Sequence, residues 1–185
     1  MRAGATVCSM ATAGPAKRLL FRAALGLYGG VLGIAARLPW KFPRFLALDA
    51  RAESLVEGGD GPRAAAFARE LLDLAELYRD DPNYGNAVHK GHLVLGRVAL
   101  MNGDVSTARS ELLLAGGTPG SPQLDSFGPN MRLAKELLEA GENGVVLEYF
   151  ELCRRFWMMG SQELARWSAA IHESRMPDFG PNLRY

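Results

Sequence analysis

The sequence predicts an all-α protein built from helix pairs that repeat along the chain. A glycine followed by an acidic residue occurs at 59–60, 103–104 and 141–142, so these dipeptides are spaced by 44 and 38 residues. A helical pattern of apolar residues follows each of them, and a repeat of this length is typical of a solenoid. Glycine can end one helix with a positive φ, and Asp or Glu favours the start of the next. We therefore predict an irregular solenoid of about three helix pairs plus a C-terminal helix.

The first 48 residues have a different charge balance from the rest of the chain. They contain seven Lys or Arg and no acidic residue, whereas the remaining residues contain fourteen bases and twenty acids. A basic arm is therefore joined to an acidic body. We predict an N-terminal arm at 1–48 and a helical-repeat domain at 49–185.

The arm contains an apolar stretch. Residues 23–36 carry no charge, and the stretch reaches 19–38 when Arg22 and Arg37 are included. Fourteen helical residues span roughly 21 Å, which is short of the roughly 30 Å hydrocarbon core of a bilayer. Three interpretations stay open: a membrane anchor at 19–38 with the domain on the cytoplasmic side, a cleaved targeting segment, and a helix buried on the body.

The central unit, from His89 to about Gly120, resembles a tetratricopeptide repeat. Units on either side match the same pattern more loosely, so the resemblance covers roughly residues 45–157. The matching positions in the central unit are Leu95, Gly96, Ala99, Gly103, Asp104, Ala108, Leu112, Ala115 and Pro119. Small residues at these positions let antiparallel helices approach closely. Two long insertions, 78–86 and 117–130, exceed the usual connections and make the predicted solenoid irregular.

After the third unit the sequence predicts one more helix. Ser161 is expected to cap it, Pro177 to follow its end, and its apolar face to consist of Leu164, Trp167 and Ile171.

The tetrapeptide Phe-Gly-Pro-Asn occurs twice, at 127–130 and at 179–182. At the first copy we expect Pro129 in the first turn of a helix and Phe127 as a packing anchor. The second copy lies too close to residue 185 for a further helix to follow within this sequence. We therefore expect it to be the stub of a fourth repeat, with Phe179, Leu183 and Tyr185 docked on the last helices. The alternative is a frayed tail whose match to the first copy is a coincidence.

The resemblance implies that the first helix of each pair lines a concave groove. It places Lys90 and Arg97 in this groove in the central unit, and Arg132 and Lys135 in the third. Asp49, Glu53 and Glu57 would line its start. We predict a scaffold that binds a protein or peptide segment, with an acidic partner favoured and with Asn86 and His89 as further contacts. The alternative interpretation of these charges is a solvated face.

The sequence contains no motif that indicates catalysis. His89 and His92 are three residues apart on one helical face and, with His172, would give three metal ligands. However, His92 occupies a packing position and no carboxylate is paired locally, so we expect no metal. Cys153, which could be paired with His172, lies between aromatic residues and is expected to be buried.

We expect no catalytic residue, no cofactor and no nucleic-acid partner. The alternative function is a small-ligand or enzymatic site at the loop-rich edge, formed by Asn86, His89, His92 and Asn130. An enclosed polar pocket around these four residues would favour that alternative, whereas an open groove would favour the scaffold.

Overall fold

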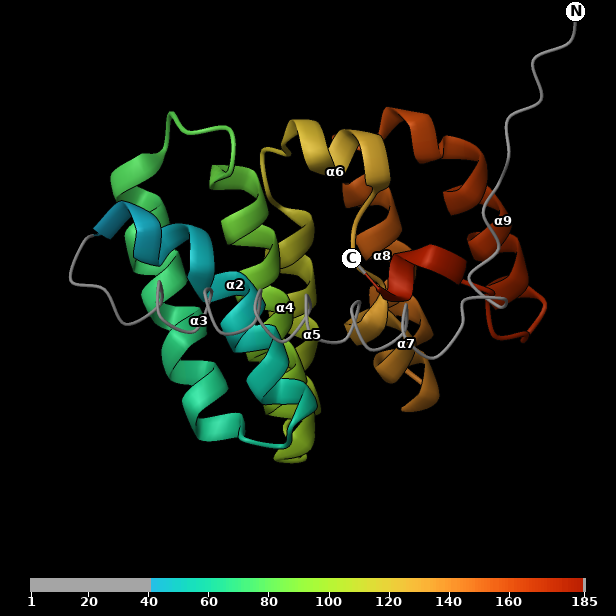
Figure 1. The fold of residues 1–185 in the computed structure, drawn as a ribbon. Coiled ribbons are helices and arrows are strands. Elements are labelled where there is room, and N and C mark those ends of the chain that lie inside the picture. The colour runs from blue at the N-terminus through green and yellow to red at the C-terminus, as the bar shows by residue number, and fades with distance from the viewer. Residues whose placement is uncertain (1–40, 185) are drawn as a thin grey trace, which may run out of the picture.

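The computed structural model describes residues 41–184, and within this range the secondary structure is helical throughout, with no strand (Figure 1). The helices are α2 (Lys41–Glu57), α3 (Gly61–Ala75), α4 (Tyr84–Met101), α5 (Val105–Gly116), α6 (Pro122–Phe127), α7 (Arg132–Glu139), α8 (Asn143–Cys153) and α9 (Ser161–His172). Short 3₁₀ helices are η2 (Glu76–Tyr78), η3 (Met158–Gly160) and η4 (Gly180–Leu183). The all-α prediction is confirmed over this range.

The three predicted glycine turns join α2 to α3, α4 to α5, and α7 to α8. Gly59, Gly103 and Gly141 have φ values of 80°, 77° and 84°, in the left-handed region that glycine adopts without strain. In all three turns the amide of the next residue donates to the carbonyl oxygen five residues earlier at 2.9 Å. This pattern is the Schellman motif, which satisfies carbonyl groups left free at a helix end. Asp60 and Asp104 then cap the following helices by accepting from backbone N–H groups.

The helix pairs lie side by side along the molecule (Figure 1). Within the first two pairs, α2 packs on α3 and α4 packs on α5, while α3 also packs on α4. The second helices of the later pairs, α5 and α8, contact each other. The first helices also meet, because α4 contacts both α2 and α7. The helices α2, α4 and α7 therefore form a continuous face, called the inner face below.

The core changes character along the chain. Between α2, α3 and α4 it consists mainly of small side chains, which we call the alanine cluster: Ala52, Leu55, Val56, Ala64, Ala65, Ala68, Val94 and Val98. Around α8 and α9 it is dominated by rings, which we call the aromatic cluster: Tyr149, Phe150, Phe156, Trp157, Trp167 and Phe179. Small residues allow close helix contact, whereas rings fill the space between helices and connections of irregular path.

The boundary predicted between residues 48 and 49 falls inside α2. Phe45 and Leu48, assigned to the arm from the sequence, are buried in the core against α3. Pro43 is compatible with this helix because it lies in the first turn of the described part, where a missing N–H costs little. The folded domain therefore includes residues 41–48.

Three local expectations about helix starts were wrong. Ser161 is the first residue of α9 rather than its cap, and its hydroxyl donates to the carbonyl of Met158. Pro129 precedes α7, which begins only at Arg132. Phe127 does not act as an anchor, because 56% of its surface is exposed. By contrast, the predicted apolar face of α9 is confirmed, since Leu164, Trp167 and Ile171 are buried.

None of the helices in the described part of the chain is both long enough and apolar enough to cross a membrane. The stretch 19–38, for which the sequence left an anchor open, lies outside residues 41–184, as do most of the arm residues.

Candidate functional site

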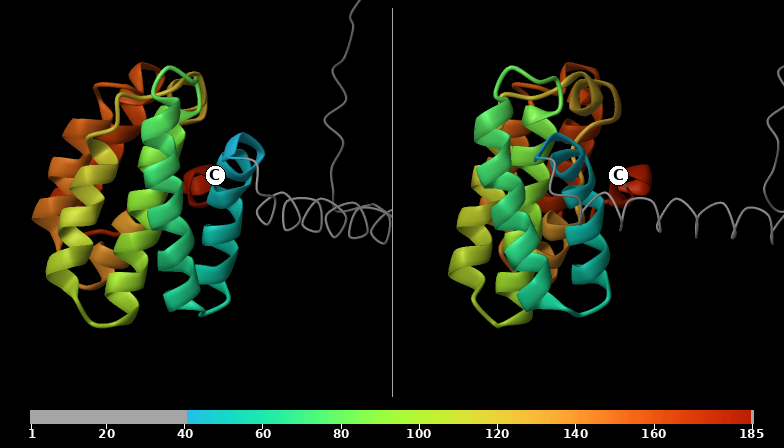
Figure 2. Two further views of the ribbon diagram at one scale, coloured as in Figure 1. Left: turned by 90° about the vertical axis from the view of Figure 1, so that its left-hand side faces the viewer. Right: turned by 60° about the vertical axis from the view of Figure 1, so that its left-hand side comes forward.

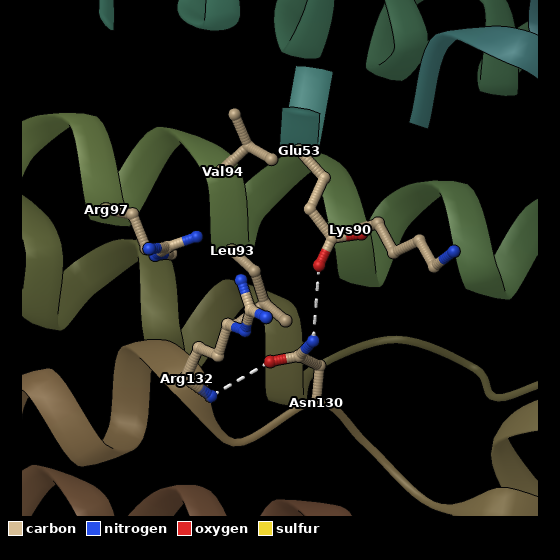
Figure 3. A pocket seen from close by; sticks show the side chains of 7 residues that line it. All are labelled: Glu53, Lys90, Leu93, Val94, Arg97, Asn130 and Arg132. Carbon is tan, nitrogen blue, oxygen red and sulfur yellow. Dashed lines mark hydrogen bonds between the residues drawn. The ribbon is translucent and has the colours of Figure 1, made fainter. Parts of the chain in front are cut away.

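The inner face brings together most of the charged residues that the sequence predicted for the groove. A small hollow lies between α2, α4 and the start of α7 (Figure 3). Its lining residues are Glu53, Lys90, Leu93, Val94, Arg97, Asn130 and Arg132. The space that water-sized molecules can enter is about 20 Å³, which is room for about one water molecule. Side chains of the protein itself therefore nearly fill this part of the inner face.

The cations of the inner face are paired with carboxylates on neighbouring helices. Lys90 on α4 lies 2.8 Å from Asp49 on α2. Arg132 on α7 pairs with Glu57 on α2.

A third pair completes the set, because Arg97 on α4 lies 2.9 Å from Glu136 on α7. Each of the three ion pairs therefore ties together a different two of the three helices. Lys135 differs from these cations because it pairs at 3.1 Å with Glu139, one turn along the same helix.

Glu53 lies in the middle of this arrangement. In Figure 3 its carboxylate points toward the side chain of Asn130, whose Nδ2 donates to it at 3.4 Å. Burial raises the pKa of Glu53, and the nearby charges of Lys90 and Arg132 oppose this rise. The hollow is therefore a mixed-charge site in which acids and bases balance, rather than a purely basic site.

Asn86 and His89 lie inside the fold rather than on the inner face. Asn86, 8% exposed, accepts from the hydroxyl of Ser121 at 2.6 Å and donates to Gln123 at 2.8 Å. His89, 1% exposed, has Nδ1 at 3.1 Å from the carbonyl oxygen of Ala115. The structure places both residues against the long connection between α5 and α7.

Asn130 joins His89 to the end of this connection. Its backbone N–H donates to Nε2 of His89 at 3.3 Å, so the imidazole is neutral with its proton on Nδ1. Burial lowers the pKa of His89 to about 4, which keeps the ring neutral at physiological pH. The hydroxyl of Tyr149 donates to the carbonyl oxygen of Asn130 at 3.3 Å. These contacts fix the path of the chain into α7.

The structure brings three of the four residues of the alternative site to one connection, and His92 lies apart from them. His92 lies 2.7 Å from Glu111 on α5, away from the contacts that Asn86, His89 and Asn130 make with the connection. Within residues 41–184, no buried side-chain nitrogen or oxygen lacks a hydrogen-bond partner, so these polar groups are already occupied. Their hydrogen bonds to other parts of the chain hold the fold.

The chemistry available to histidine and cysteine in the described residues is limited. No group of three or more His, Cys, Asp or Glu side chains comes close enough to hold a metal ion in this part of the chain. Cys153 is fully buried, and burial raises the pKa of its thiol, so the thiolate that would act as a nucleophile is disfavoured.

The C-terminal tail, residues 177–184, docks on the segment that leads into α7. The side chain of Asn182 donates to the carbonyl oxygens of Phe127 and Pro129 at 3.1 and 3.0 Å. The carbonyl oxygen of Asn182 accepts from the N–H of Met131 at 2.8 Å. The two copies of Phe-Gly-Pro-Asn are therefore bound to each other.

The tail also reaches the inner face. Nε of Arg132 donates to the carbonyl oxygen of Leu183 at 2.6 Å, while the same guanidinium pairs with Glu57. Figure 2 shows η4 on the same side of the molecule as α2. Sequence reasoning missed Asn182 as a contact residue, although the repeated tetrapeptide was a signal that pointed to it.

Comparisons of the chain with models of protein families, with curated proteins and with solved structures gave no match. The geometry of the inner face allows hydrogen bonding to a peptide backbone and exchange of ion pairs.

Proposed function

We propose that the chain is a non-catalytic scaffold that binds a peptide or protein segment on the inner face. The observation that carries the proposal is that a peptide segment, the chain's own tail, reaches the edge of this face at Arg132. Arg132, one of the cations expected to bind a partner, donates to a main-chain carbonyl of the tail. A contact of this kind recognises a peptide whatever its side chain at that position.

The proposal includes a tetratricopeptide-like organisation of the three helix pairs. It is supported by the three glycine turns with the same hydrogen-bond pattern and by the contacts between the first helices. In such a short solenoid, α2, α4 and α7 line the concave side, which is the usual place for an extended ligand.

An acidic ligand would bind by exchanging ion pairs. Lys90 and Arg97 are held by Asp49 and Glu136, and a carboxylate of the ligand competes with these residues for the same cations. Because one ion pair replaces another, little net energy comes from the charges, and hydrogen bonds to the peptide backbone supply the rest. We therefore expect reversible binding of moderate affinity.

The test is a selection from a random peptide library against the full-length chain, followed by affinity measurement of the selected peptides. The test variant exchanges a pair of the inner face, Arg97→Glu with Glu136→Arg, which keeps an ion pair but reverses its direction. The matched control exchanges an exposed pair on α9, Glu163→Arg with Arg166→Glu. We expect at least a roughly tenfold weaker affinity for the first variant and an unchanged affinity for the control, since a tenfold change needs only about 1.4 kcal/mol.

Two results would contradict the proposal. One is that no peptide is selected by the folded chain. The other is that the selected peptides bind equally to both variants, which would place the binding surface away from the inner face.

Membrane association through residues 19–38, with the folded domain on the cytoplasmic side, remains a separate proposal that rests on the apolar stretch and the excess of basic residues in the arm. It is tested by flotation of the full-length chain with vesicles. If the chain remains in the dense fraction with both neutral and anionic vesicles, the proposal fails.

A further inference from the structure

We propose that the C-terminal tail is exchanged between two copies of the chain, so that the tail of each copy occupies the tail site of the other. This inference rests on the contacts of residues 177–184 and on the turn before them. It does not require the inner face to bind any other peptide.

The tail makes a self-contained set of contacts with the body. Phe179 is 1% exposed, and its ring centre lies 5.0 Å from that of Trp167 and 6.3 Å from that of Phe150. The indole N–H of Trp167 donates to the carbonyl oxygen of Asp178 at 2.9 Å. With the hydrogen bonds of Asn182 and Leu183, these contacts give the tail an apolar anchor and a polar anchor on the same site.

The site is shaped closely around the tail. Gly128 has φ of 83°, and a Cβ at this position would come within 2.5 Å of Trp157 and 2.8 Å of Nδ2 of Asn182. The backbone at Gly128 is therefore close enough to the tail for Asn182 to reach the carbonyl oxygens on either side. A site of this kind recognises a defined segment, and a second copy of the chain carries the same segment.

The turn that leads into the tail is exposed and strained. Residues 172–176 are all exposed, whereas Pro177 and Phe179 on its far side are buried. Ser174 has φ of 56° and is the one non-glycine residue with a positive φ in the described part of the chain. Its N–H donates to the carbonyl oxygen of Ile171, and the N–H of Arg175 donates to the carbonyl oxygen of Ala170. These two hydrogen bonds form the helix-ending turn in which glycine normally occupies the position of Ser174.

This turn is needed only when the tail folds back onto its own body. If residues 172–176 extend instead, Ser174 leaves the left-handed conformation and the tail reaches a second copy. All contacts of the tail with its site are kept in the exchanged dimer, so the two forms differ mainly in the hinge and in the entropy of association. Strain in a short hinge favours exchange of this kind.

The experiment measures the monomer–dimer equilibrium of the full-length chain by sedimentation over a wide range of concentrations. Ser174→Gly removes the strain of the closed form and should reduce dimerisation, because glycine adopts positive φ freely. Ser174→Val increases the strain and should promote dimerisation. If each substitution changes the equilibrium constant for opening one hinge by about fivefold, the dissociation constant of the dimer changes by about 25-fold, because two hinges open in each dimer.

The second measurement uses the synthetic nonapeptide Pro-Asp-Phe-Gly-Pro-Asn-Leu-Arg-Tyr, the sequence of residues 177–185. An excess of this peptide should dissociate the dimer by filling the site, whereas the same peptide with Ala in place of Asn182 should not. Any association through the arm is common to all variants and does not depend on Ser174.

The proposal is overturned if the wild-type chain and Ser174→Val are monomeric at every concentration. It is also overturned if dimers form but neither the substitutions at Ser174 nor the nonapeptide changes their population. Opposite shifts for the two Ser174 variants, together with dissociation by the peptide, are the result that we expect.

Discussion

Between α2, α3 and α4 the protein is packed with small side chains, whereas around α8 and α9 it is packed with rings. In the alanine cluster, small side chains let the helices lie close together. In the aromatic cluster, rings from α8, α9 and the tail fill the space that the irregular connections leave. The removal of a side chain should therefore cost most in the second region, where each buried side chain is a large ring.

The largest effect is expected from removing a ring in the aromatic cluster. Trp167→Ala should lower the free energy of unfolding by about 3 to 5 kcal/mol, because it opens a cavity next to Phe150, Trp157 and Phe179. Denaturant unfolding measures this loss, and Trp167→Phe should lose less because it keeps one ring. A loss below about 1 kcal/mol for Trp167→Ala would mean that the cluster readily collapses around the cavity.

The second effect is a dependence of stability on pH that comes from His89, which holds the long connection between α5 and α7. Its pKa is about 4 in the folded protein and 6.5 in the unfolded chain, so the unfolded state binds a proton first as the pH falls. This contribution to stability is therefore present above pH 6.5 and is lost between pH 6.5 and 4, by about 3 kcal/mol.

The control for this effect is the difference in stability between wild type and His89→Gln, measured at each pH. The difference should shrink as the pH falls through this window. If the stability of His89→Gln runs parallel to that of wild type, His89 is not buried in its neutral form.

The third effect tests the close packing of α3 against α4. In Gly91→Ala the new Cβ would lie 2.7 Å from Cγ of Leu72, between α4 and α3. Although alanine is the better helix former by about 1 kcal/mol, we expect a net loss of about 2 kcal/mol from the forced separation of the helices. Thermal unfolding measures it.

The matched control is Gly144→Ala in α8, where a Cβ meets nothing within 4 Å. This substitution should stabilise the protein by up to about 1 kcal/mol. If Gly91→Ala stabilises the protein as Gly144→Ala does, the Cβ at position 91 is accommodated without cost.

The smallest effects concern the charges of the inner face. Arg132→Gln loses the ion pair with Glu57 on α2 and weakens the contact with the tail, so we expect a loss of about 1 kcal/mol. Lys135→Gln loses only an exposed pair within α7 and should stay within about 0.5 kcal/mol. Equal effects in thermal unfolding would mean that the pairs between helices add nothing to the fold.

The sequence predicted well those features that depend on neighbouring residues. The glycine turns could be predicted because a glycine with positive φ, followed by an acidic residue, is a short pattern visible in the sequence. The resemblance to a tetratricopeptide repeat implied that Asp49, Glu53, Lys90 and Arg132 share one face. It did not reveal that the acids of α2 neutralise the bases of α4 and α7, because the partners of these pairs are far apart in the sequence.

Features that depend on distant segments were predicted less well. The doubled tetrapeptide led to the expectation that Phe179 is docked, which its burial confirms. The binding of Asn182 to the first copy of the tetrapeptide was not foreseen, since it requires the actual course of the connection. Asn86 and His89 were expected to bind a partner because their side chains are polar. Nothing in their local sequence indicates that they hold residues 115–130.

The central claim is that the site occupied by the tail, at the edge of the inner face, is a binding site for a peptide segment. It is tested most directly by adding the nonapeptide of residues 177–185 to the chain from which these residues have been deleted, and following the melting temperature by circular dichroism. We predict that the deletion lowers the melting temperature and that the peptide raises it again in a saturable way, whereas the peptide with Ala in place of Asn182 has a much smaller effect. A deleted chain that melts like the full-length protein and does not respond to the peptide would contradict the account.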